Sequence, residues 1–189
     1  ATKKCLAVLH VSGLSYRKLG HLQGRVGSSI YRKAQPAITK LPPCIQVTSQ
    51  YCDPNLFSGI LVVDGKYLNV KGNKKKLPVI YGIDYTSHDI PNYILSRKGE
   101  DYLTCRSFFR SLREAGYPLK AVISDDNPAF ANAARDVYPG IRIQLCHNHY
   151  LDNIRRNLGL WRHLKYQEFF SDLKAICMTS QSVQEFRKR

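Results

Sequence analysis

Two successive prolines, Pro42 and Pro43, divide the chain into parts of different character. Because proline cannot continue a helix, the helical pattern before it must end near Leu41. Apolar residues before this point have helical spacing, whereas from Gly59 onward short apolar runs typical of strands alternate with helical patterns. A chain of 189 residues has room for one small module and one domain of about 130 residues. The sequence therefore predicts an all-α module at residues 1–41, a linker at 42–57 and an α/β domain at 58–160.

The charge of the chain indicates a polyanionic partner. There are 29 Lys and Arg against 14 Asp and Glu, a net charge of +15 at pH 7. The excess is concentrated at the start, since residues 1–52 carry eight basic side chains and no acid. Nucleic acid is therefore the leading candidate partner.

No segment indicates a membrane partner. The longest aliphatic run, Ile60 to Val63, is far too short to span a bilayer, and no signal-peptide pattern opens the chain. Six cysteines without a closely spaced framework are typical of reduced thiols. We expect a soluble protein in the cytoplasm, associated with DNA, or in the nucleus if the host is eukaryotic.

The first part of the chain predicts three helices. Lys3 to Val11 is the first, Ser15 caps a second that runs through Leu22, and Ser28 or Ser29 begins the third. The segment from Gly13 to Gly20 resembles helix-turn-helix modules, which bind DNA in the major groove. The alternative is a generic three-helix bundle with a solvated basic face. If the module binds DNA, the candidate contacts are Arg17, Lys18, Arg25, Arg32 and Lys33.

The second part predicts three strands followed by helix, strand, helix, strand, helix. This order is expected of a ribonuclease-H-like mixed sheet with flanking helices. Asp64 ends the first strand and Asp125 follows a later one, where an α/β sheet presents ligands. Paired carboxylates suit Mg²⁺ or Mn²⁺, and two such ions support phosphodiester chemistry. The alternative is that Asp125 caps a helix and Asp64 turns a hairpin.

A third feature is the run Cys146-His147-Asn148-His149, which stands between a strand and a helix. Cys146 and His149 are three residues apart and can share a helical face. A zinc site needs more ligands, and Cys44 and Cys52 are only a weak signal for them. We expect the pair to support the catalytic edge instead.

Three blocks resemble the DDE transposases of the Mutator-like superfamily and their prokaryotic insertion-sequence relatives. Leu61 to Val70 is similar to the first-aspartate block, and Val122 to Asp125 is similar to the second. Gln144 to Asn153 is similar to the C-x-x-H block, with Cys146 and His149 in its two defining positions. The resemblance implies a ribonuclease-H-like core that cuts transposon ends and joins them to target DNA. It implies Asp64 and Asp125 as catalytic metal ligands.

The third carboxylate of this superfamily is normally a Glu on a helix beyond a helical insertion. Downstream of the C-x-x-H block the sequence offers only Glu168 and Glu185, of which Glu168 is the candidate. Residues 164–177 predict an insertion helix, and Ser182 to Glu185 is a capping box that opens another. We expect residues 161–189 to be the start of a truncated insertion, and the chain as given to bind DNA without efficient cleavage.

Three functions remain open at this point. The first is a metal-dependent transposase whose partner is double-stranded DNA, both transposon ends and target, and the resemblance is compatible with a homo-oligomer. The second is a non-catalytic DNA-binding protein, a truncated or domesticated transposase that acts as a regulator. The third is a ribonuclease-H-like nuclease unrelated to transposition, which the C-x-x-H block does not favour.

Overall fold

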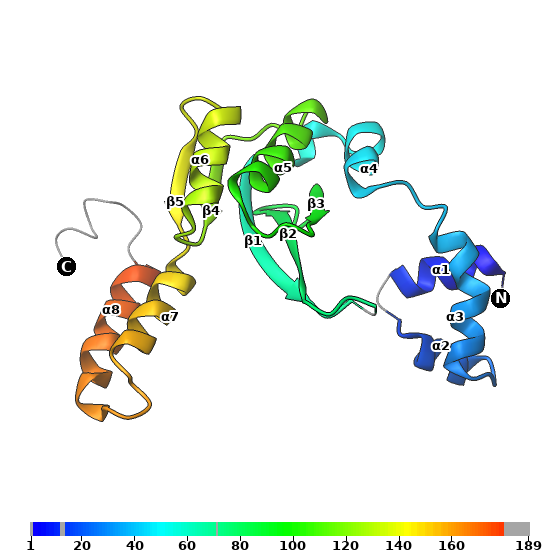
Figure 1. Ribbon diagram of the computed structural model, residues 1–189, viewed down its shortest axis with the longest axis horizontal. Helices are drawn as coiled ribbons and strands as arrows, with labels where there is room; N and C mark the ends of the chain where they lie inside the picture. The colour runs from blue at the N-terminus through cyan, green and yellow to red at the C-terminus, as the bar shows by residue number, and fades with distance from the viewer. Residues whose placement is uncertain (1, 12–13, 71, 180–189) are drawn as a thin grey trace. The chain divides into compact units, whose positions relative to one another are not determined.

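The computed structural model describes residues 2–11, 14–70 and 72–179, and the chain divides into two compact units between Pro43 and Cys44 (Figure 1). The first unit is helical and the second is built around a sheet. The change of pattern at the two prolines therefore coincides with a boundary between compact units.

Three helices form the first unit: α1 (Lys3–Val11), α2 (Tyr16–Leu22) and α3 (Gly27–Ile38). Ser15 caps α2 as the sequence predicted, since its Oγ accepts the backbone N–H of Lys18 at 3.2 Å. The third helix begins earlier than predicted, at Gly27, with Val26 as its N-cap. The helices pack through a small apolar core of Leu6, Leu19, Ile30 and Ala34.

The turn between α2 and α3 is tight because of Gly20. The backbone N–H of Arg25 donates to the Gly20 carbonyl at 2.8 Å, and Gly24 has a φ of 61°. A methyl group on Gly20 would overlap the carbonyl oxygen of Arg25 and touch the backbone at Gly27. Glycine at this position therefore fixes how closely α3 follows α2.

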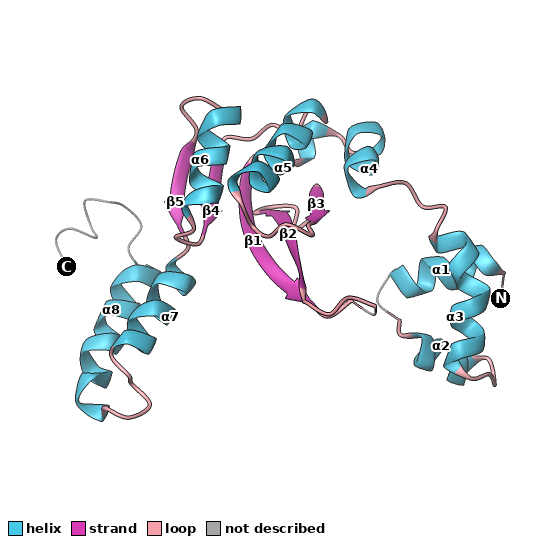
Figure 2. Cartoon of the chain, viewed as in Figure 1, coloured by secondary structure: helices cyan, strands magenta, loops and turns pink. Residues whose placement is uncertain are grey.

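The described part of the second unit has a five-stranded sheet in the order β3-β2-β1-β4-β5 (Figure 2). The strands are β1 (Ile60–Leu68), β2 (Leu77–Asp84), β3 (Asn92–Leu95), β4 (Ala121–Ser124) and β5 (Arg142–Leu145). β1, β2 and β3 form an antiparallel meander, whereas β4 and β5 extend β1 in parallel. This mixed sheet confirms the predicted α/β, ribonuclease-H-like fold.

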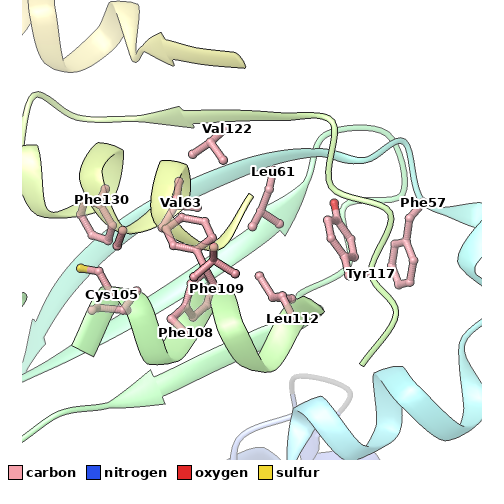
Figure 3. Packing of buried hydrophobic residues seen from close by; sticks show 14 residues of the cluster. Phe57, Leu61, Val63, Cys105, Phe108, Phe109, Leu112, Tyr117, Val122 and Phe130 are labelled. Atoms are coloured by element: carbon pink, nitrogen blue, oxygen red, sulfur yellow. The ribbon is translucent and has the colours of Figure 1, made fainter. Parts of the chain in front are cut away.

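Helices α5 (Tyr102–Glu114) and α6 (Pro128–Val137) bury the apolar side of the sheet. Their buried aromatic residues Phe108, Phe109 and Phe130 meet Leu61 and Val63 of β1 (Figure 3). These side chains are fully or almost fully buried. Their burial, at about 25 cal/mol per Å² of apolar surface, is the main favourable term that holds the sheet in register.

The predicted linker at 42–57 is not a linker throughout. Residues Cys44–Tyr51 form helix α4, and Pro54–Leu56 form a 3-10 turn, η1. The buried Thr48 donates its hydroxyl to the carbonyl of Pro91 at 2.6 Å, and Ile45 packs against the core of the second unit. Helix α3 ends at Ile38, shortly before the two prolines, and a second helix begins directly after them at Cys44.

The chain ends its described part in a helical hairpin. Helix α7 (His147–Asn157) leads away from β5, and a 3-10 turn, η2 (Leu164–Tyr166), precedes α8 (Gln167–Thr179), which returns beside α7 (Figure 1). The predicted helix containing Glu185 lies outside the described residues. Among the described helices none is long and apolar enough to cross a bilayer.

Candidate active site

The two predicted catalytic aspartates lie on neighbouring strands, but Asp64 does not end its strand as predicted: β1 continues to Leu68 through its pairing with β2, whereas Asp125 directly follows β4. β1 and β4 are parallel, and Val62 pairs with Ile123. Asp64 and Asp125 each stand two residues beyond this pair, so they lie at the same level along the sheet, where β4 ends, and on the same face. Both are half-buried. The sheet therefore brings together the two carboxylates that the sequence singled out.

Asp64 is held by two hydrogen bonds. Its Oδ1 accepts the backbone N–H of Gly65 at 2.8 Å, and its Oδ2 accepts the hydroxyl of Tyr81 at 3.2 Å. Tyr81 comes from β2, where it is the direct antiparallel partner of Asp64. Burial, followed by the charge of Asp64 and this hydrogen bond, raises the pKa of Tyr81. Tyr81 is therefore a neutral donor that orients Asp64, a role that the sequence gave no sign of.

Asp125 and Asp126 begin the turn into α6 but make different contacts. Asp125 Oδ1 accepts the backbone N–H of Asn127 at 3.2 Å, while Asn127 itself caps α6. Among the described residues no donor reaches Asp125 Oδ2. The exposed Asp126 is 3.5 Å from the side-chain amide of Asn153 on α7. The helix-cap alternative therefore applies to Asn127, and Asp125 keeps one oxygen free of protein donors.

The Cys146-x-x-His149 motif sits beside the first aspartate. Cys146 is the N-cap of α7, and its backbone N–H donates to the carbonyl of Ser124 at 2.6 Å, which ties the start of α7 to the end of β4. One turn later, His149 Nε2 lies 4.0 Å from Asp64 Oδ1, and its Nδ1 is buried with no partner among the described residues. The motif thus places His149, and not the Cys146 side chain, within reach of the carboxylates.

A carboxylate that sequence analysis missed lies against Gly65, the residue after Asp64. Glu100 precedes the N-cap of α5, and its carboxyl occupies the space that a side chain on Gly65 would fill. Its Oε1 is buried and has no hydrogen-bond partner among the described residues. Burial, then the charge of Asp125, then that of Asp64 raise the pKa of Glu100. In the sequence, Glu100 looks like any acidic residue near the start of a helix, so no local pattern singles it out.

Asp84 ends β2 in a context similar to that of Asp64 but is a structural residue. It is fully buried and accepts hydrogen bonds from the backbone of Ser58, Gly59, Thr86 and Ser87, and from Tyr117 Oη at 2.6 Å. Burial acts to raise its pKa, but the hydrogen bonds from Tyr117 and the backbone lower it to about 2. Donors therefore surround both oxygens of Asp84.

Glu168, the candidate third carboxylate, is not brought to this group. It stands exposed in the first turn of α8, and α8 contacts α7 and η2. Helix α7 carries the chain about 16 Å away from the site at roughly 1.5 Å per residue before α8 begins. The 43-residue interval between Asp125 and Glu168 is compatible with a third catalytic carboxylate at Glu168. Glu168 nevertheless stands where α8 begins, at the end of the α7–α8 hairpin that is far from Asp125 (Figure 1).

The basic side chains proposed for DNA contact lie on the first unit. Arg17 and Lys18 are on α2, Arg25 is in the turn, and Arg32 and Lys33 are on α3. All are exposed except the half-buried Lys33. None forms an ion pair with a carboxylate among the described residues. Their charges are therefore available to a polyanion.

Comparison with known proteins places the chain in a family. The family model described as "Transposase, Mutator family" matches residues 2–188. The chain belongs to the Mutator family of transposases. This membership confirms the resemblance carried by the two aspartate blocks and the C-x-x-H block. No curated protein matches the chain.

Several solved structures are similar at low identity. The catalytic core of human T-cell lymphotropic virus type 2 integrase, in complex with magnesium, is 18% identical over 70% of this chain and 82% of that chain, with a TM-score of 0.39. A simian T-cell lymphotropic virus intasome is 16% identical over 97% of this chain and 66% of that chain, with a TM-score of 0.41. The Mos1 transposase paired-end complex is 12% identical over 99% of this chain and 74% of that chain, with a TM-score of 0.36. All three TM-scores lie below 0.5, so membership in the family rests on the sequence match.

The carboxylates of this Mutator-family chain fit a divalent cation only after they reorient. Within the described ranges, no three His, Cys, Asp or Glu side chains converge as a ready metal-binding group. Asp64 and Asp125 turn oxygens toward protein N–H and O–H donors instead. The unpartnered Oε1 of Glu100 beside them is nevertheless the kind of buried oxygen that a hard cation satisfies.

Proposed function

We propose that this chain acts in transposition as a metal-dependent phosphodiester-cleaving and strand-transfer protein that binds transposon-end and target DNA. The observation that carries the proposal is the position of Asp64 and Asp125 at the same level of two neighbouring parallel strands, where β4 ends, in a chain of the Mutator family. Ligands bind at this edge of an α/β sheet. A pair of neighbouring carboxylates can bind catalytic cations, and this pair is what distinguishes a catalytic core from a scaffold that only binds DNA.

Asp64 and Asp125 are the proposed ligands of Mg²⁺ or Mn²⁺. When bound, such cations activate an attacking hydroxyl and stabilise the leaving oxygen of a phosphodiester. Tyr81 holds Asp64 in place through its hydroxyl, and His149 lies on the other side of the same carboxylate. These two side chains orient Asp64 and limit how far it turns.

DNA binding is assigned to the first unit. Four exposed basic side chains there have no acidic neighbour in sequence, because the first carboxylate of the chain is Asp53. Phosphate contacts from such side chains supply affinity without sequence specificity, and helix α3 is the proposed reader of the major groove.

The test is nicking of a supercoiled plasmid by the purified chain in Mn²⁺. Because efficient cleavage by the chain as given is not expected, we expect only weak nicking, and Asp64→Asn and Asp125→Asn should each abolish it. The matched control is Asp172→Asn, which removes the same charge from an exposed site on α8. Absence of nicking by the unsubstituted chain, or nicking that survives both substitutions, would overturn the catalytic part and leave a DNA-binding protein without catalysis.

A further inference from the structure

The face of the sheet that carries Asp64 is not covered by α5 or α6. These helices bury the opposite side, which carries Leu61 and Val63 of β1. Because side chains alternate along a strand, Asp64 and Lys66 point to the side that these two helices leave open. On the same side, at the edge of the sheet, Tyr93 of β3 is 52% exposed. A large aromatic side chain therefore lies on the same face as the candidate active site.

The strand register places Tyr93 in line with Asp64. Asp64 pairs with Tyr81 on β2, and Tyr81 pairs with Tyr93 on β3. Residues that pair directly across strands point to the same face, so the three side chains form one row. Two strand spacings of about 4.8 Å put the backbone of Tyr93 about 10 Å from that of Asp64. Tyr81 is half-buried and donates its hydroxyl to Asp64, so Tyr93 supplies the exposed ring of the row.

The ring of Tyr93 has no aromatic or hydrogen-bonding partner in the fold. No hydrogen bond and no ring contact joins this side chain to another of the described residues. In the next row, Lys66 pairs with Val79, and Val79 pairs with Leu95, whose side chain is 49% exposed. Tyr93, Val79 and Leu95 therefore form an apolar surface on the open face, which we call the Tyr93 platform.

The position of the Tyr93 platform favours a nucleobase as its ligand. In the proposed function a DNA phosphodiester lies at Asp64, so the nucleotides next to it pass over a row that extends about 10 Å to Tyr93. Aromatic side chains stack on the flat face of any base. Lys66 stands about 7 Å from Asp64 along β1. It is exposed and forms no ion pair within the described ranges, so its charge suits a neighbouring phosphate.

Stacking on Tyr93 requires a base that is not paired. Inside a duplex the adjacent base pairs cover both faces of each base, so a protein ring reaches a face only after the nucleotide leaves the stack. We infer that the Tyr93 platform binds an unpaired base of the DNA strand whose phosphate lies at Asp64. The inference rests on the proposed function for Asp64 and deepens it, since it names locally unpaired DNA as the preferred substrate.

The experiment compares two duplexes of the same sequence and with the same ends. One is fully paired, and the other has an unpaired bulge in one strand that contains 2-aminopurine, a base whose fluorescence falls when it stacks. Affinities for both are measured in Ca²⁺, which carboxylates also bind, so that DNA approaches Asp64 under conditions chosen for binding. The affinity for the paired duplex is the reference for each variant, and thermal unfolding followed by circular dichroism checks that each variant folds.

The variants separate the ring of Tyr93 from its hydroxyl and from exposed tyrosines in general. Tyr93→Ala removes the ring, whereas Tyr93→Phe keeps the ring and removes the hydroxyl. Tyr67→Ala is the matched control, because Tyr67 is 54% exposed on the same sheet but points to the opposite face. Tyr81 is left unchanged because its hydroxyl holds Asp64.

We expect the unsubstituted chain to prefer the bulged duplex about tenfold and to quench the 2-aminopurine. Tyr93→Ala should lose both the preference and the quenching, while Tyr93→Phe and Tyr67→Ala should keep them. Plasmid nicking that depends on Asp64, together with no preference for the bulge or a preference that survives Tyr93→Ala, would refute the inference and leave the proposed function standing. A preference that Tyr93→Ala removes, in a chain whose nicking does not depend on Asp64, would support base binding at Tyr93 and refute the catalytic role.

Sedimentation velocity of the DNA-free chain tests the other occupant of an exposed apolar face, a second copy of this chain. We expect Tyr93→Ala to leave the sedimentation coefficient unchanged. A dimer that Tyr93→Ala converts to a monomer would assign the Tyr93 platform to an interface between copies and would overturn the inference.

Discussion

Replacing Asp84 by Asn should destabilise the second unit strongly, whereas the same change at Asp64 should not. Both acids stand on central strands, so sequence context alone does not separate them. The difference lies in their donors: backbone groups and a buried tyrosine surround Asp84, while Asp64 accepts hydrogen bonds from two donors. The fold therefore stabilises the carboxylate of Asp84 through more donors than that of Asp64.

The magnitude for Asp84 follows from its contacts. A pKa lowered from 3.8 to about 2 corresponds to about 2 kcal/mol of stability at neutral pH, at about 1.36 kcal/mol per pKa unit. The Asn amide would also face either Tyr117 and Gly59 or the backbone of Thr86 and Ser87, all of which are donors. Buried donors without acceptors add about 1–3 kcal/mol. The total loss is about 3–5 kcal/mol, or roughly 10 °C in melting temperature.

Differential scanning calorimetry of the unsubstituted chain, Asp84→Asn and Asp64→Asn in EDTA measures both effects. Calorimetry is suited because two compact units need not unfold in one transition. We expect Asp64→Asn to change the free energy of unfolding by less than about 1 kcal/mol. Because the folded pKa of Asp84 lies below its unfolded value, its contribution is present above about pH 4 and is lost as the pH falls toward 2. Equal destabilisation by the two substitutions would refute this distinction.

Three further outcomes are expected. The logarithm of the DNA association constant should fall with the logarithm of the salt concentration with a slope of about −4 to −5. The triple variant Arg17→Gln/Lys18→Gln/Arg25→Gln should reduce the magnitude of this slope by about 2 to 3. The control variant Lys74→Gln/Lys75→Gln/Lys76→Gln changes exposed side chains of the second unit, and an equal effect there would assign DNA binding to the second unit. Gly20→Ala should lower the melting temperature of the first unit and weaken DNA binding without changing Mn²⁺ binding, as filter binding and calorimetry would show. His149→Ala should reduce plasmid nicking and leave DNA affinity unchanged; a loss of DNA affinity would make it a DNA contact.

Sequence analysis found the residues whose positions are set by local pattern. An apolar run that ends in an acid predicts a buried strand with a carboxylate at its end, and this reasoning placed Asp125 directly after β4, although β1 continues past Asp64 to Leu68. The first helix, Lys3–Val11, was also predicted to the residue. What these features share is that the information lies within a few residues of the feature itself.

Sequence analysis was wrong or silent where contacts between distant segments decide. Helix α4 was predicted as linker because its stability comes from Thr48 and the carbonyl of Pro91, 43 residues away. Glu100 and Gly65 are 35 residues apart, and only the return of the chain from β3 brings them together. The number of residues between Asp125 and Glu168 is compatible with a shared site. That number does not predict the direction of α7, which carries the chain away from Asp125 before Glu168.

The carboxylates of the second unit can be separated by the number of protein donors that face them. Asp84 and Asp101 accept the hydrogen bonds that a strand end and a helix start require, so binding a cation would first break those bonds. Asp125 has one carboxylate oxygen that accepts no hydrogen bond from a described residue, and Glu100 has one that is both buried and without a hydrogen-bond partner among the described residues. Desolvation makes such oxygens expensive unless a positive charge compensates. The fold thus leaves one buried oxygen of Glu100 unpaired, while it surrounds both oxygens of Asp84 with donors, so stability alone accounts for Asp84 and does not account for Glu100.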